Sequence, residues 1–311
     1  MRLAGLTLTG VVAGELGIDV ASLVRGGEIY YPVTKVPTKR LPEPWWVVQL
    51  ADPHIGGVGM DMVNTDVCKQ VANTTITKLQ SLGAKPERTV LAFVGDGVIG
   101  DTETELLTPM DMFMEGMHSF DAVPAQWRFS VQGNHDVRWM ERHKGNLQRA
   151  NEKLGYEVLG WNNEDRTVVN SAHMPFQVVG TPDYTTNPEW YLKPDKSFFS
   201  DLQKGKPTIW LTHNASPFDE CGWGESLAQN DYNLTVLCGH THGGQISGPS
   251  VFQLIGESYA LSTIDYKSGY ISGMYACGGD VRINVCNGLG SSSAIARTAE
   301  RQVSILELIP A

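Results

Sequence analysis

Residues 239–244 read Gly-His-Thr-His-Gly-Gly and directly follow the apolar run of residues 235–238, Thr-Val-Leu-Cys. The two histidines, His240 and His242, are two residues apart and flanked by glycines, so one tight loop can present both imidazoles to neighbouring metal ions. Histidines buried in a hydrophobic core rarely occur as such a pair. The end of this apolar run is therefore the first candidate for a functional site.

Four earlier apolar runs also end at polar residues. They lead into Asp52-Pro53-His54, Gly95-Asp96, Gly133-Asn134-His135-Asp136 and His213. Each pattern alone is weak, because Asp-x-His and Gly-Asp are common and the third pattern is also typical of an Asx-turn. Open α/β folds place their ligands at the carboxyl ends of strands, so the five runs together predict a single site at the edge of a sheet.

The side chains at these five positions offer carboxylate oxygen, amide oxygen and imidazole nitrogen, with no thiolate among them. Zn, Mn or Fe would suit this combination of donors. The candidate metal ligands are Asp52, His54, Asp96, Asn134, His213, His240 and His242.

The succession D-x-H, G-D, G-N-H-D, a single His and G-H-x-H resembles the calcineurin-like metallophosphoesterase family, over nearly everything from residue 50 to residue 245. The resemblance implies an α/β fold in four layers, with a central two-sheet β-sandwich flanked by helices and a dinuclear metal site at the carboxyl ends of the strands. A finer similarity, to the YkuE/YaeI-like phosphodiesterase branch, rests on three segments. They are Gly-His-Thr-His-Gly-Gly-Gln-Ile at 239–246, Asn-Gly-Leu-Gly at 287–290 and Gly-Thr-Pro-Asp at 180–183.

The resemblance also implies a role for each matching residue of this chain. The predicted metal ligands fall into three groups: Asp52, His54 and His242 on the first ion, Asn134, His213 and His240 on the second, and Asp96 bridging both. Two such ions hold phosphoryl oxygens and a bridging hydroxide during an in-line displacement.

Beside these ligands, His135 is expected to be the catalytic histidine and Asp136 the residue that orients it. Arg138 is close enough in sequence to contact a substrate phosphate. The chain departs from the family at one place. Family members usually carry a second acid three residues after the bridging aspartate, whereas Ile99 stands there and an acid follows only at Asp101.

Residues 1–44 are predicted to form an N-terminal extension that ends in a proline-rich linker, and residues 45–311 the metallophosphoesterase domain. Residues 11–24 have a pattern typical of a helix-turn-helix, but Arg2 and Arg25 are the basic residues of positions 1–34. An apolar helical hairpin is therefore preferred over a DNA-binding unit. Helices are expected near residues 61–82, 105–118 and 146–154, and a β-hairpin between 270 and 285.

The formal net charge of −10 argues against a broad basic surface that would bind the nucleic-acid backbone electrostatically. No signal peptide or membrane-spanning run is evident, and the five cysteines include no CxxC pair. We therefore expect a cytoplasmic protein with mostly free thiols, a bridge between Cys277 and Cys286 being the alternative. No oligomeric state is predicted.

These patterns together favour a phosphodiesterase that hydrolyses a small or lipid-linked phosphoester with two divalent metal ions. Two alternatives remain open. A DNA or RNA nuclease would use the same metal site, although the acidic balance and the lack of basic clusters weigh against it. A catalytically inert metal-binding scaffold is the other alternative, and the presence of every expected motif weighs against that.

Overall fold

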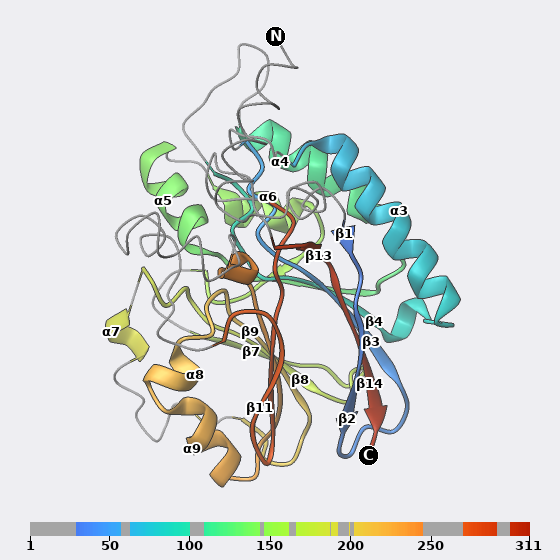
Figure 1. The fold of residues 1–311 in the computed structure, drawn as a ribbon, viewed down its shortest axis with the longest axis vertical. Helices are drawn as coiled ribbons and strands as arrows, with labels where there is room; N and C mark the ends of the chain where they lie inside the picture. The colour runs from blue at the N-terminus through green and yellow to red at the C-terminus, as the bar shows by residue number, and fades with distance from the viewer. Residues whose placement is uncertain are drawn as a thin grey trace, which may run out of the picture.

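The computed structural model describes residues 29–56, 63–99, 109–143, 146–161, 166–186, 188–191, 199, 202–244, 270–290 and 299–311. Two six-stranded sheets dominate this part of the chain, and a two-stranded ladder joins β1 (Ile29–Tyr30) to β13 (Arg301–Gln302). The sheets occupy the middle of the molecule, with helices on either side (Figure 1).

The first sheet has the strand order β2-β14-β3-β4-β5-β6. Its strands are β2 (Val33–Thr38), β14 (Ser304–Pro310), β3 (Trp45–Leu50), β4 (Thr89–Phe93), β5 (Trp127–Ser130) and β6 (Glu157–Val158). The last four run parallel to one another, and β14 pairs antiparallel with β3. The carboxyl ends of β3, β4 and β5 therefore lie at one edge of this sheet.

The second sheet has the order β11-β12-β10-β9-β8-β7. Its strands are β11 (Gly273–Gly278), β12 (Asp280–Val285), β10 (Asn233–Cys238), β9 (Thr208–Leu211), β8 (Gln177–Gly180) and β7 (Thr167–Asn170). The inner four are parallel, and each edge strand is antiparallel to its neighbour. The predicted hairpin between 270 and 285 is confirmed as β11 and β12.

Side chains alternate between the two faces of each sheet, so the core has one apolar layer between the sheets and others between a sheet and its helices. Val47 and Val90 of the first sheet share one apolar cluster with Ile209 and Leu237 of the second, so the sheets pack face to face. Residues at the alternate positions, such as Val48, belong to a second cluster with helical residues. The predicted two-sheet sandwich is confirmed.

Helices cover both outer faces. The first face carries α3 (Thr65–Ser81), α4 (Pro109–His118) and α6 (Leu147–Lys153), which confirm the three predicted helices. The second face carries α8 (Pro217–Glu220) and α9 (Trp223–Gln229). Figure 1 shows α3 and α4 on one side of the strands and α8 and α9 on the other. Two further helices, α5 (Asn134–His143) and α7 (Pro188–Tyr191), complete the described set together with short 3-10 turns such as η4 (His242–Gly244).

Part of the predicted proline-rich linker belongs to the first sheet. Strand β2 pairs in parallel with β14 from Val33 to Thr38, and the side chains of Val36 and Thr38 are buried. Pro37 suggested a linker because it lacks an N–H group, but an edge strand tolerates this loss on its free side. The helix-turn-helix-like segment at 11–24 lies outside the described residues, as does Asp101.

None of the described helices is both long enough and apolar enough to cross a membrane. All five cysteines are free, so the alternative of a bridge between Cys277 and Cys286 is not found.

Candidate metal centre

The predicted ligands come from loops of both sheets, and the sandwich brings these loops together. Backbone hydrogen bonds join the loops after β3 and β4: Asp52 N donates to Gly95 O at 3.0 Å, and His54 N donates to Asp96 O at 3.1 Å. Another hydrogen bond joins loops of the two sheets: His240 N, after β10, donates to the carboxylate of Asp52, after β3, at 3.0 Å. The site thus spans two sheet edges, where a single edge was expected from the five runs.

Six of the predicted ligands form a compact buried cluster. The Nε2 atoms of His54 and His242 are 3.0 Å apart, and His213 Nε2 lies 3.1 Å from Asp96 Oδ2. His240 Nδ1 lies 3.3 Å from His213 Nε2. Three sets of donor atoms within 4.8 Å of one another could each hold an ion: Asp52, His54 and His242; His54, Asp96 and His135; and Asp96, His213 and His240.

These residues fit divalent cations. Two imidazole nitrogens 3.0 Å apart, in a wholly buried setting, are the arrangement expected when both lone pairs face one ion. The seventh predicted ligand, Asn134, is 4% exposed, and its Oδ1 has no hydrogen-bond partner among the described residues. A buried amide oxygen without a partner is costly, and a cation would satisfy it.

The outer nitrogens of two histidines are held by backbone carbonyls. His213 Nδ1 lies 2.8 Å from Val94 O, and His242 Nδ1 lies 3.2 Å from Gly290 O. A proton on each Nδ1 makes that bond and leaves the Nε2 lone pair for the cluster, as in metal-binding histidines generally. Gly290 N in turn donates to Asp52 O at 2.7 Å, so the predicted segment 287–290 supports the site.

The backbone at the site is strained. Seven non-glycine residues of the described chain have positive φ angles, and five of them are predicted ligands: Asp52, His54, Asp96, His240 and His242. Such conformations are unfavourable for residues with a Cβ atom and persist where surrounding contacts impose them. Their concentration here indicates that the fold holds these side chains in fixed directions.

Two glycines allow the loops to approach the carboxylates. A Cβ atom on Gly239 would lie 2.3 Å from Asp52 Oδ2, and one on Gly133 would lie 2.2 Å from Asp96 Oδ1. Neither position has room for a side chain. The glycines that mark the motifs in the sequence are therefore required by the packing of one loop against another.

Helix α5 was not predicted, because residues 133–136 were interpreted as a turn. The helix begins at Asn134, and the Asp136 carboxylate reaches back to Gly133 N at 2.9 Å, as in a capping box. The carboxylate also accepts hydrogen bonds from Asp96 N and Gly97 N, each at 2.8 Å, and from Val98 N at 3.3 Å.

The expectation that Asp136 orients His135 is not supported by these contacts. Both oxygens of Asp136 are used by backbone N–H groups, so this residue ties the loop after β5 to the loop after β4. Burial, and the charge of Asp96 after it, raise the pKa of Asp136 to about 7, whereas the N–H donors of Gly133 and Val98 act to lower it.

His135 itself lies at the cluster and is less buried than the ligands. Its ring centroid is 4.9 Å from that of His54, and its backbone N donates to Asp96 Oδ1 at 2.8 Å. Burial lowers the pKa of His135, Asp96 opposes that shift, and the charge of Arg138 adds to it. Arg138 is exposed on α5 and thus lies within electrostatic reach of His135.

Burial decides the protonation of two further histidines. It lowers the pKa of His54 to about 3 and that of His240 to about 4, so both are neutral imidazoles near pH 7, as metal binding requires. For Asp96, burial acts to raise the pKa, but the neighbouring His213, His135 and His54 together outweigh it and hold the pKa well below its usual range. For His213, burial acts to lower the pKa, and the neighbouring Asp96 raises it well above its usual value.

One buried acid near the site was not among the predicted residues. Asp183 follows β8, and its charge acts to raise the pKa of His213 and opposes the lowering of the pKa of His135 and His240. The Gly-Thr-Pro-Asp sequence at 180–183 was the signal that could have found it.

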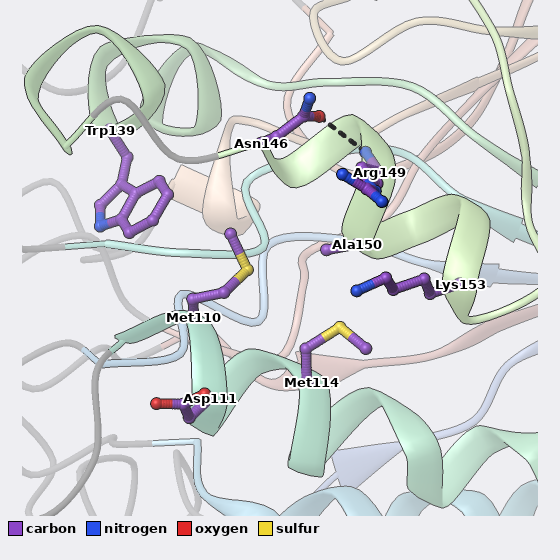
Figure 2. A pocket seen from close by; sticks show the side chains of 8 residues that line it. All are labelled: Met110, Asp111, Met114, Trp139, Asn146, Arg149, Ala150 and Lys153. Carbon is purple, nitrogen blue, oxygen red and sulfur yellow. Dashed lines mark hydrogen bonds between the residues drawn. The ribbon is translucent and has the colours of Figure 1, made fainter.

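A pocket of about 360 Å³ lies between α4, α5 and α6. Figure 2 shows Met110 and Met114 of α4 at its floor, Trp139 of α5 at one end, and Arg149 and Lys153 of α6 along its rim. Asp111, Asn146 and Ala150 complete the lining. None of the predicted metal ligands belongs to it.

Comparison with known proteins agrees with this geometry. A family model described as calcineurin-like phosphoesterase matches residues 46–244. The chain belongs to this family. All five motifs lie inside the matched region, and the predicted family and its metallophosphoesterase fold are confirmed.

Two curated relatives support the YaeI-like branch. The chain is 29% identical over 181 residues to the phosphodiesterase YaeI of Escherichia coli (strain K12), which is 58% of each protein. It is 28% identical over 133 residues to the uncharacterized metallophosphoesterase YkoQ of Bacillus subtilis (strain 168), covering 42% of this chain and 43% of the relative. The chain thus spans less than two thirds of the length of these relatives.

Proposed function

We propose that the protein is a metal-dependent phosphodiesterase with a two-ion site. The observation that carries this proposal is that Asp96 belongs to two candidate ligand sets, one with His54 and His135 and the other with His213 and His240. A carboxylate suits a bridging position because each of its oxygens can bind one ion. The family membership and the phosphodiesterase relative support the same chemistry.

The proposed ligand assignment follows the clusters. Asp52, His54 and His242 hold one ion, Asn134, His213 and His240 hold the other, and Asp96 binds both. Four neutral imidazoles and one amide leave the two carboxylates as the negative ligands, so a loaded site remains attractive to a phosphoester anion. Zn, Mn and Fe all suit these donors.

The ions, when bound, supply a nucleophile at neutral pH and neutralise the charge of phosphoryl oxygens. The chain supplies the remaining functions. His135 is the proposed catalytic residue and stabilises the charge of the leaving oxygen or donates a proton to it, since its ring adjoins the ligands but is only partly buried. Arg138, exposed one helical turn further along α5, contacts the phosphate of the substrate.

The pocket favours a lipid-linked phosphodiester over a small polar one. Two of its walls adjoin segments that carry predicted ligands: α5 begins at Asn134, and a Cβ atom on Gly56, two residues after His54, would lie 3.4 Å from Pro109 Cβ at the start of α4. Its apolar floor suits an alkyl chain, and the two cations on its rim suit an anionic group.

A chain-length series tests this finer proposal. Among alkyl p-nitrophenyl phosphodiesters, KM should fall as the alkyl chain grows, and Met114→Ser should weaken that trend. The Met114 side chain lines the pocket and lies outside the metal cluster. A KM that is independent of chain length in both proteins would leave the small phosphodiester as the substrate class.

The two alternatives, a nuclease and an inert scaffold, predict different assay results. A nuclease would degrade single- or double-stranded DNA faster than a small phosphodiester, whereas the proposed enzyme would not. An inert scaffold would bind two ions per chain without turnover.

The direct test is hydrolysis of bis(p-nitrophenyl) phosphate after reconstitution with Mn²⁺, Zn²⁺ or Fe²⁺. Turnover that disappears in Asp96→Asn supports the proposal. Two bound ions without turnover, under every metal tried, would instead support the scaffold.

A further inference from the structure

The loop after β8 brings a buried acid to the metal site. Strands β8 and β9 are parallel with Gly180 opposite Leu211, and Thr181 N donates to Leu211 O at 3.1 Å. Residues 181–183 therefore leave the sheet beside residues 212 and 213. His213 and Asp183 are both 0% exposed, and they lie on adjacent loops at the same edge of the second sheet.

Several contacts fix this loop. The Asp183 carboxylate accepts hydrogen bonds at Oδ2 from Thr185 Oγ1 and, at 2.9 Å, from Thr186 N. The Tyr191 hydroxyl donates to Pro182 O, and Trp210 Nε1 donates to Thr181 Oγ1 at 3.2 Å. These bonds hold the acid inside the protein and leave it no route to solvent without disrupting the loop.

The second oxygen of this carboxylate is unused by the described chain. Asp183 Oδ1 is buried and has no hydrogen-bond partner among the described residues. A buried carboxylate oxygen without a donor is costly, so its retention in a fixed loop suits a partner from outside the described residues, such as a bound substrate. The loop fixes Oδ2 through the threonines and leaves Oδ1 for that partner.

The charge of Asp183 acts on the part of the site where the second ion is proposed to bind. It acts on His213 and His240, the proposed ligands of that ion, and on His135. Any phosphate bound there meets a fixed negative charge that the ligand set does not need. A phosphomonoester near neutral pH carries close to two negative charges and a phosphodiester carries one, so the repulsion falls more heavily on the monoester.

We propose that Asp183 is a specificity-determining residue, which disfavours phosphomonoester dianions and accepts a hydrogen bond at Oδ1 from a hydroxyl or amine donor on a phosphodiester substrate. This inference rests on the proposed two-ion site. It adds a reason why that site acts on diesters, and it narrows the substrate to one with a donor group near the phosphate.

The test compares wild type with Asp183→Asn, which keeps the shape of the side chain and removes its charge. The ratio of kcat/KM for bis(p-nitrophenyl) phosphate to that for p-nitrophenyl phosphate should fall by roughly 10-fold in the variant, as expected for one extra charge repelled across a partly screened site. Metal content should remain at the wild-type level.

A binding measurement gives a readout besides turnover. Inorganic phosphate at pH 8, mostly a dianion, should bind the metal-loaded variant about 10-fold more tightly than wild type by calorimetry, with a smaller change for the monoanion dimethyl phosphate. The matched control is Asp231→Asn, which removes a charge from an exposed residue before β10 where asparagine tolerates the positive φ angle. This control should leave the kcat/KM ratio of diester to monoester and the affinity for inorganic phosphate unchanged.

Equal loss of both activities in Asp183→Asn, or unchanged phosphate affinity, would overturn the proposal. Absence of turnover in the wild type is a different result and counts against the proposed function. The calorimetric comparison still decides the role of Asp183 in that case.

Discussion

Two segments, each after a strand of a different sheet, bring a buried aspartate to the metal site, and they use it in opposite ways. In the segment after β5, where α5 begins, both oxygens of Asp136 accept hydrogen bonds from backbone N–H groups. In the loop after β8, Asp183 uses Oδ2 for its own loop, while Oδ1 has no partner within the described chain. The two acids are equally buried, to within 1% exposure.

The difference separates a structural carboxylate from a functional one. A buried acid whose oxygens are all satisfied contributes to stability, and removing it leaves orphaned N–H groups. A buried acid with an unused oxygen lowers the stability of the fold, and we expect its binding to a ligand or substrate to compensate for that loss. The comparison therefore predicts opposite consequences for the two residues.

The largest effect is expected for Asp136→Ala. Four backbone N–H groups lose their acceptor in a buried place, so the free energy of unfolding should fall by about 3–5 kcal/mol, the range for breaking a buried charged network. Urea denaturation followed by fluorescence measures this change. A loss below about 1 kcal/mol, typical of an ordinary surface substitution, would remove the structural role assigned to the residue.

Next in size is His135→Ala, beside Asp136 at the start of α5. The proposed catalytic imidazole is lost while the backbone bond from residue 135 to Asp96 survives, so kcat should fall by about 10²–10⁴-fold with both ions retained. Steady-state kinetics and elemental analysis on one sample measure both quantities. Full activity at intact metal content would show that His135 is not a catalytic residue.

Metal removal should have a smaller effect, and it tests whether Asp183 is a metal ligand. At metal concentrations about 100 times the dissociation constant, one bound ion stabilises the fold by about 2.7 kcal/mol, and chelation removes that contribution. Asp183→Asn should lose as much on chelation as wild type does, because Asp183 is not a proposed ligand. Calorimetric scans with and without EDTA measure the difference, and an Asp183→Asn protein that is insensitive to EDTA would place this residue among the ligands.

The smallest effect is expected on the stability of the metal-free Asp183→Asn protein. The amide keeps an acceptor for Thr186 N and removes a buried charge, so the free energy of unfolding should change by less than about 1 kcal/mol in either direction. Urea denaturation of the apoprotein beside Asp136→Ala tests this directly. Equal destabilisation of the two variants would abolish the distinction between the loops.

The sequence predicted the ligand residues well because each lies in a short motif directly after an apolar strand. Such motifs are local, and their glycines mark places where loops nearly touch, as at Gly133 and Gly239. The family resemblance then supplied the arrangement into two sheets, which the strand ends alone did not predict.

Three features could not be read from local sequence. Strand β2 forms by pairing with β14 near the other end of the chain, and its Pro37 led to the prediction of a linker. The role of Asp136 depends on N–H groups some 40 residues away in sequence, at Asp96 and Gly97. The unused oxygen of Asp183 emerges only when the burial of the loop and all its contacts are known.

The central claim is that Asp96 joins two metal ions in one hydrolytic site. The most direct measurement titrates metal-free protein with Mn²⁺ and follows bound metal and hydrolysis of bis(p-nitrophenyl) phosphate on the same samples. The account predicts that turnover reaches its maximum at two ions per chain in wild type, and that Asp96→Asn binds fewer than two and is inactive. Maximal turnover at one ion per chain, or full activity in Asp96→Asn, would contradict it.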